Sequence, residues 1–149
     1  MKRLFAAAAV AGLTASGLVA VSASGDDHHG SSRIVVHESA TFTSQTDNGA
    51  AGPSAGDMFT FTGKLTGDES ADEAGVCTLA DATTAVCSVS ETFEDGQLVL
   101  EGSFSLTTDR FQIAIVGGTG EFARARGWVD VHNLNAEGTE ADLVFHVLS

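Results

Sequence analysis

The chain has 149 residues and a formal net charge of −13, with twenty acidic residues against seven basic ones. This length favours a single domain. The large acidic excess repels phosphate backbones and anionic membranes, which argues against nucleic acid and membrane surfaces as partners.

The first 23 residues have the pattern of a secretory signal peptide. Lys2 and Arg3 form a basic start, Leu4 to Val21 is a mostly apolar run, and Val21-Ser22-Ala23 fits a cleavage site. A membrane anchor is the alternative, but glycine and hydroxyl residues weaken the run as a span. We therefore expect a secreted, extracellular protein with no membrane association after cleavage. Its charge would then be −15, because two of the seven basic residues and no acidic ones are removed.

The remaining chain alternates between β-rich runs and turns. Residues 24–32 are small and polar, which predicts a disordered leader. Residues 44–57 are predicted to be a long loop, and the acidic stretch 67–75, GDESADEAG, a solvated turn. The predicted strands are 33–43, 58–65, 76–79, 84–93, 97–106, 111–116, 128–134 and 139–148.

No helical period extends beyond two turns, so the fold class is predicted to be all-β. Short strands joined by turns at regular spacing are typical of a sandwich or a barrel. Eight up-and-down strands can close into a barrel with room for one small ligand, and closure removes exposed edges. We predict an eight-stranded antiparallel barrel over residues 33–149, with a sandwich as the alternative.

Cys77 and Cys87 are the two cysteines of the chain. In a secreted protein, an even pair predicts a disulfide. The short loop that it closes would stabilise the fold by about 3 kcal/mol in the chain-entropy model. A zinc site would need more ligands than this region offers, and redox pairs usually have CxxC spacing.

The segment from Ile113 to Ala123 matches a strand followed by GxGxxA, the fingerprint of dinucleotide-binding domains. The context does not fit that function. A helix starting near Glu121 would end within two turns, at Gly127 and the β-prone Trp128. The 22 residues after Gly127 are too few for the rest of a doubly wound sheet. The glycines are therefore more simply explained by a tight connection between two antiparallel strands.

The same segment carries a family resemblance. Residues 117–127, GGTGEFARARG, resemble the GGTG-x-F-x-x-ARG signature of dirigent proteins and of the related allene oxide cyclase barrels. GVCT at 75–78, DGQL at 95–98 and LVFH at 143–146 resemble secreted bacterial members of that superfamily. The resemblance implies a calycin-like barrel of eight antiparallel strands, in agreement with the strand count.

The resemblance also implies a function, the binding and orienting of a small apolar or phenolic molecule inside the barrel. An apolar cavity restricts the conformers of its ligand, and a few polar groups then steer charge. The implied role is dirigent-like steering, either non-catalytic or cofactor-free, and a cofactor-free isomerase or cyclase is the alternative. An ionisable carboxyl group inside the barrel would favour the enzyme, and a wholly apolar interior would favour steering. We expect no cofactor and no metal, and whether a homo-oligomer forms is left open.

Two residues are candidates for catalysis. Val36-His37-Glu38 resembles the His-Asp pair on the first strand of plant dirigent proteins. An inward-pointing Glu38 would have a raised pKa and would suit a general acid, whereas an outward one would be an ordinary surface residue. Arg126 of the signature is expected either to hold an anionic oxygen of the ligand or to form a structural ion pair.

The candidate ligand-binding residues are aromatic or lie on one late strand. Phe42, Phe59 and Phe61 are expected to line the cavity. Asp130 and His132 share a strand face with Trp128, an arrangement that either converges on a ligand or lines a solvated face. Glu91 and Glu101 are expected on the surface, opposite the apolar faces of their strands.

Overall fold

The structure, a computed structural model, describes residues 30–148. The expected signal peptide, 1–23, and residues 24–29 of the expected leader lie outside the described residues. Among residues 30–148, no helix is long and apolar enough to cross a membrane.

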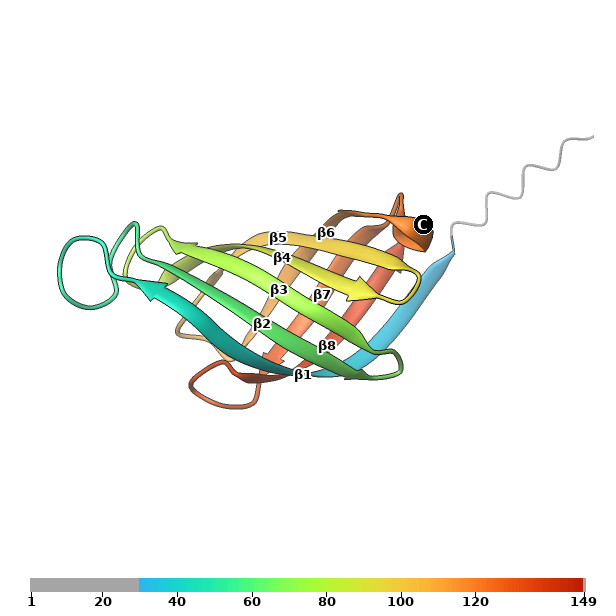
Figure 1. Cartoon of the computed structure of the whole chain (residues 1–149), viewed down its shortest axis with the longest axis horizontal. Helices are drawn as coiled ribbons and strands as arrows, with labels where there is room; N and C mark the ends of the chain where they lie inside the picture. The colour runs from blue at the N-terminus through green and yellow to red at the C-terminus, as the bar shows by residue number, and fades with distance from the viewer. Residues whose placement is uncertain (1–29, 149) are drawn as a thin grey trace, which may run out of the picture.

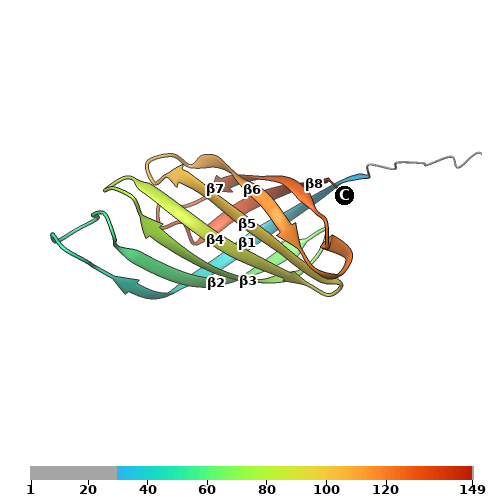
Figure 2. The same cartoon turned by 90° about the horizontal axis from the view of Figure 1, so that it is seen from above.

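Eight antiparallel strands close into a single barrel, in which each strand pairs with the next and β8 pairs with β1 (Figures 1 and 2). The predicted all-β fold and the predicted antiparallel eight-stranded barrel are both confirmed. One short 3-10 helix, η1 (Gly120–Phe122), interrupts the strand sequence. The strands are β1 (Ser31–Thr46), β2 (Met58–Gly67), β3 (Ala71–Leu79), β4 (Thr84–Phe93), β5 (Gly96–Ser105), β6 (Arg110–Gly118), β7 (Arg126–Asn133) and β8 (Glu140–Leu148).

Alternation of side chains along the strands creates the core. In β8, Ala141, Leu143, Phe145 and Val147 are buried, and the residues between them lie on the outer face of the barrel. Successive side chains of a strand point to opposite faces, so one apolar set fills the interior while the polar set remains hydrated. The interior is therefore made of every second residue of each strand.

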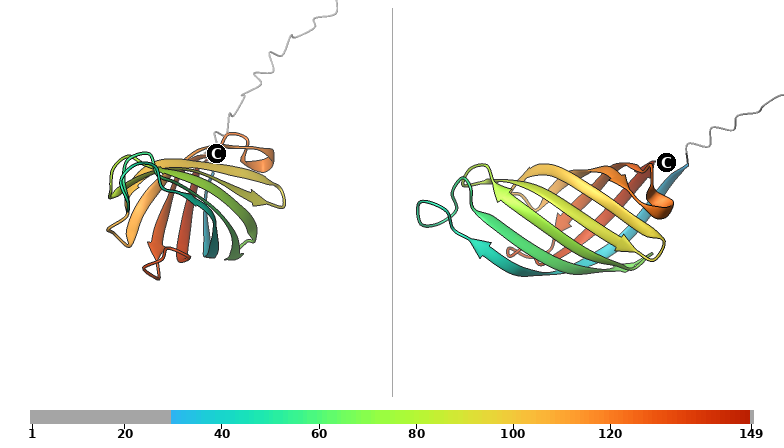
Figure 3. Two further views of the ribbon diagram at one scale, coloured as in Figure 1. Left: turned by 60° about the vertical axis from the view of Figure 1, so that its left-hand side comes forward. Right: turned by 45° about the horizontal axis from the view of Figure 1, so that its top comes forward.

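The two ends of the barrel differ (Figure 3). At one end, η1 lies near the β4–β5 turn, and the ring of Phe93 packs against those of Phe122 and Phe145, with centroids 5.2 and 6.1 Å away. Gly120 has a φ of +59°, and a Cβ there would clash with the Asp95 backbone. The signature glycines thus seal this end by close backbone packing. The opposite end carries the loops that follow β1, β3, β5 and β7.

Some element bounds differ from those expected. Ser31 and Ser32, assigned to the leader, begin β1. The predicted acidic turn at 67–75 is shorter, because β3 starts at Ala71 and pairs with Leu65 of β2. Continued pairing with β2 compensates for the low β-propensity of these acidic residues, since propensity depends strongly on context. This extension brings Glu73 into the barrel wall.

The predicted disulfide between Cys77 and Cys87 is present. The two cysteines are direct partners in the register of β3 and β4, and both are buried. The bond therefore lies on the inner wall and fixes two adjacent strands to each other.

Candidate functional site

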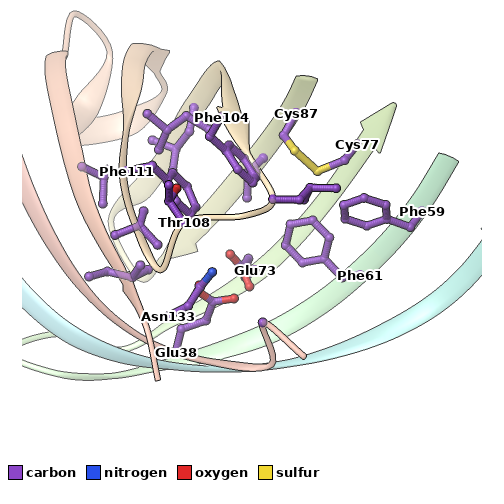
Figure 4. A pocket seen from close by; sticks show the side chains of 18 of the residues that line it. Glu38, Phe59, Phe61, Glu73, Cys77, Cys87, Phe104, Thr108, Phe111 and Asn133 are labelled. Carbon is purple, nitrogen blue, oxygen red and sulfur yellow. A yellow bond between two sulfur atoms is a disulfide. The ribbon is translucent and has the colours of Figure 1, made fainter. Parts of the chain in front are cut away.

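A cavity of about 170 Å³ lies inside the barrel at the end opposite η1 (Figure 4). It is lined mainly by apolar side chains, including Phe42 and Phe61 near one wall and Phe104 and Phe111 near the other. An apolar cavity of about 150 Å³ is known to hold a benzene molecule. The space therefore suits one aromatic ring with a short substituent.

The aromatic side chains of the cavity form two groups from opposite sides of the barrel. On β1 and β2, Phe42 meets Phe59 edge-on, with 5.5 Å between the ring centroids. On β5 and β6, Phe104 and Phe111 are stacked at 3.9 Å. Rings from both sides offer a flat molecule apolar contact on each of its faces.

Three carboxyl groups lie at the inner end of this cavity. Glu38 projects from β1, Glu73 from β3 and Glu91 from β4, with only 9%, 6% and 0% of their surfaces exposed. Glu73 and Glu91 are direct partners in the β3–β4 register. Figure 4 shows Glu38 and Glu73 next to each other. Gly63 of β2 leaves room for them, since a Cβ there would clash with Glu73 Oε2.

Burial dominates the electrostatics of the cluster. It raises the pKa of Glu73 to about 10 and that of Glu91 to about 8, and the charge of Glu38 adds to both effects. The pKa of Glu38 is also raised, again chiefly by burial. Carboxyl groups that lose water and face one another favour the neutral form. The cluster therefore retains protons at neutral pH, and these are shared among groups that titrate together.

Several of the buried oxygens are unsatisfied. Oε2 of Glu73 and both carboxyl oxygens of Glu91 have no hydrogen-bond partner outside the cluster among the described residues, so these carboxyl groups can pair only with one another. Buried polar atoms in proteins are nearly always paired, so an unpaired cluster needs an explanation. Perturbed ionisable groups in a cavity are typical of functional sites.

Four of the expected site residues line the cavity, namely Glu38, Phe42, Phe59 and Phe61. Arg126 does not. Its side chain is exposed at the sealed end, where Nη1 donates a hydrogen bond to the Ala125 carbonyl oxygen at 2.7 Å. The expected partnership of Glu38 with Arg126 is therefore not formed, because the signature packs the sealed end while the cavity opens at the other.

Asp130 and His132 do share a strand face, but it is the outer face. Asp130 accepts hydrogen bonds from Gln112 at 2.6 Å and from His146 at 2.8 Å, and His132 accepts one from Arg110 at 3.0 Å. Neither residue lines the cavity, because the inward positions of β7 belong to Val129 and Val131. Their position on the outer face does not support the expected role of Asp130 and His132 in binding a ligand inside the cavity.

The expectation that Glu91 lies on the surface is wrong, since it is fully buried. The signal was present in the sequence: counting by two along β4 places Glu91 with Cys87, Val89 and Phe93, which are all buried. Glu101 is exposed, as expected. The sequence did not predict Glu73 as an interior residue for a different reason. The acidic stretch that contains it has the composition of a solvated turn.

A closed barrel with an apolar cavity and a few converging polar groups is an architecture that accommodates a small molecule. A comparison with protein families identifies the family of the chain. The family described as "Dirigent-like protein" matches residues 37–148. The chain belongs to the dirigent-like family, as its signature indicated.

Solved structures with the same fold include three of stated activity. A pyocyanin demethylase is 23% identical, with a TM-score of 0.68 over 77% of this chain and 99% of that chain. A pterocarpan synthase dirigent protein is 16% identical, with a TM-score of 0.61 over 80% and 94%. A Diels–Alderase from Streptomyces koyangensis is 15% identical, with a TM-score of 0.60 over 78% and 63%. At these identities the likeness shows the fold alone. Comparison with curated proteins finds no match.

Proposed function

We propose that the protein binds a small, largely apolar molecule with an aromatic ring in its cavity. We propose further that it promotes a cofactor-free rearrangement or coupling of that molecule. The observation that carries this proposal is the cluster of three buried carboxyl groups at the inner end of an open, aromatic-lined cavity. A wholly apolar interior would have favoured steering alone.

The cavity would contribute orientation. Aromatic walls on two sides limit a ligand to few conformers, and holding reacting groups in place can lower a barrier by several kcal/mol. Glu38 would contribute proton transfer. It is the most exposed of the three acids, and burial raises the pKa of its carboxyl group above the ordinary value. A positioned general acid typically accelerates a reaction by roughly 10²–10⁴-fold.

Two further points support the proposal. The pterocarpan synthase dirigent protein and the Diels–Alderase, which share this fold, are named for reactions of small molecules. The buried disulfide fits an oxidising compartment, and on that ground we propose that the protein acts outside the cell. Dirigent-like steering without catalysis is the second candidate, and the aromatic walls alone would suffice for it.

The binding half of the proposal is tested by closing the mouth of the cavity. Thr108 is exposed and lines the mouth, whereas its exposed neighbour Thr107 does not line it. We expect the neutral one-ring ligand 2-phenylethanol, followed by NMR chemical shifts, to bind the wild type and Thr107→Trp equally. Thr108→Trp should weaken binding by about tenfold or more, which corresponds to about 1.4 kcal/mol, because the indole ring would occupy the mouth of the cavity. Equal binding by all three proteins would show that the cavity is not the site.

The catalytic half needs a substrate. Native mass spectrometry of the purified protein identifies any retained small molecule, which is then assayed for conversion. We expect Glu38→Gln to reduce turnover at saturating ligand by about 10²-fold, because the amide cannot donate a carboxyl proton. The matched control is Glu101→Gln on the outer wall. Binding without any conversion by the wild type would leave dirigent-like steering as the function.

A further inference from the structure

The inner end of the cavity holds acidic groups without a basic one. The titratable residues that line the cavity are Glu38, Glu73 and Glu91, together with Glu137 of the β7–β8 loop. Within residues 30–148, no lysine, arginine or histidine lines it. Interior positions near the cluster on β2, β5, β7 and β8 carry only uncharged side chains, such as Leu65, Leu100, Asn133 and Leu143.

The outer wall does not supply the missing positive charge. His37 is the nearest base to Glu38, and its Nε2 pairs with Glu140 at 2.8 Å on the outer face. The charge of Glu140 acts on Glu38 in the opposite direction to that of His37. Any cation that compensates the cluster therefore has to enter through the cavity.

The unpaired oxygens show what such a ligand must offer. Glu91 is fully buried and neither of its carboxyl oxygens has a partner outside the cluster, and the same holds for Oε2 of Glu73. When the cluster is ionised these atoms are acceptors, and no other described side chain supplies a donor to them. A buried acceptor without a donor is costly, so a ligand that supplies N–H donors and positive charge recovers that cost.

The aromatic walls favour the same class of ligand. Phe59 and Phe61 line the cavity on β2, the strand between β1 with Glu38 and β3 with Glu73. A cation within about 6 Å of a ring face is attracted by the ring, and more strongly where water is excluded. Among the described residues, no group of acids, histidines and cysteines has the arrangement of a metal site. An organic cation is therefore the better occupant.

We propose that Glu38, Glu73 and Glu91 form a binding site for the protonated nitrogen of a small aralkyl amine, in which a short alkyl chain joins the nitrogen to an aromatic ring that lies among the cavity phenylalanines. This inference rests on the proposed function and names its substrate class. On binding, one carboxyl O–H releases its proton to solvent. The resulting carboxylate then accepts a hydrogen bond from the ammonium N–H, so that one proton leaves for each cation bound.

Proton release makes the affinity depend on pH. While the cluster retains protons and the amine is charged, affinity rises by up to about tenfold for each pH unit when one proton is released. The rise ends as the cluster ionises, or near the ordinary pKa of an alkylammonium, about 10 as in lysine. A neutral molecule of the same shape releases no proton and shows no such rise.

The test compares 2-phenylethylamine with its neutral isostere 2-phenylethanol. Each is titrated into the full chain at pH 6, 7 and 8, with binding followed by NMR chemical shifts. We expect the amine's affinity to rise by about tenfold per pH unit and the alcohol's to stay within about twofold. Calorimetry of the amine in buffers of different ionisation enthalpy should show about one proton released.

Glu73→Gln is the informative variant, because an amide imitates a protonated carboxyl and the fold should be retained. We expect it to weaken amine binding, flatten its pH dependence and leave the alcohol unaffected. Glu101→Gln on the outer wall should behave as the wild type, and thermal unfolding checks that both variants are folded. Equal, pH-independent binding of amine and alcohol would overturn this inference while the proposed function stands. Binding of neither compound, at concentrations where a cavity of this size takes up aromatic rings, would overturn both.

Discussion

The two faces of the barrel wall carry acidic groups with opposite behaviour. Inside, burial raises the pKa of Glu73 and of Glu91. Outside, a hydrogen bond from Gln112 and the neighbouring His146 lower the pKa of Asp130. The carboxyl group thus tends to keep its proton inside the barrel and to be ionised on the outer face. The only difference is whether water and donors reach it.

His37 and Glu38 show how little separates the two faces. They are adjacent on β1, yet Glu38 lines the cavity while His37 pairs with Asp142 and Glu140 on the outside. Because strand side chains alternate, a shift of one residue in register would exchange them. Pairing of β1 with both β2 and β8 prevents that shift. The alternation of side chains along β1 therefore decides that Glu38, and not His37, can reach a ligand in the cavity.

The largest expected effect concerns Glu91 and alkaline pH. Its pKa in the folded protein, about 8, lies above its ordinary value of 4.5. Its contribution to stability is thus complete below about pH 4.5 and is lost as the pH rises through about 8. Each pKa unit is worth about 1.4 kcal/mol. The free energy of unfolding of the wild type should therefore fall by several kcal/mol across this window, as measured by urea unfolding.

Glu91→Leu should remove part of this loss and raise the free energy of unfolding at pH 8 by about 3 kcal/mol. At pH 4 the variant and the wild type should differ much less. Glu101→Leu on the outer face of β5 serves as the matched control and should leave the pH profile unchanged. A wild-type profile that is flat between pH 5 and 8 would show that the inner carboxyls are hydrated, and the contrast between the two faces would fail.

An intermediate effect is expected at Gly63, which makes room for the inner cluster. A Cβ at this position would meet Glu73 Oε2 and would lie 3.2 Å from the Ser39 carbonyl oxygen. Gly63→Ala should therefore lower the free energy of unfolding by about 2 kcal/mol, the usual cost of overpacking. Combining it with Glu73→Ala removes the main clash, so the double variant should be more stable than the sum of the single effects implies. Additive effects in urea unfolding would show that Glu73 does not occupy this space.

The sequence was sufficient for the fold but not for the site. Alternating apolar residues and regular turns specified eight strands, and the glycine signature specified the family. The carboxyl cluster at the inner end of the cavity was only partly predictable. Glu91 could have been assigned to the interior by counting along its strand, since it shares a face with Val89 and Phe93. Glu73 could not, because an acidic run normally marks a solvated turn, and only its pairing with Gly63 reveals the strand. Arg126 belongs to the most specific motif, yet that motif seals the end away from the cavity.

The smallest effect is expected on the outer wall, at Asp130, and it should have the opposite sign. The pKa of this carboxyl is lowered in the folded protein, chiefly by Gln112. Its contribution is therefore present above the ordinary pKa of 3.8 and is lost as the pH falls through the folded value. Asp130 is 45% exposed, so solvent screens the effect, and Asp130→Asn should cost only about 0.5 kcal/mol at pH 7. That difference should shrink towards pH 3. Asp47→Asn in the exposed β1–β2 loop is the control for the removal of one surface charge. If Asp130→Asn instead stabilised the protein increasingly with pH, as expected for Glu91→Leu, side-chain parity would not account for the difference between the two faces.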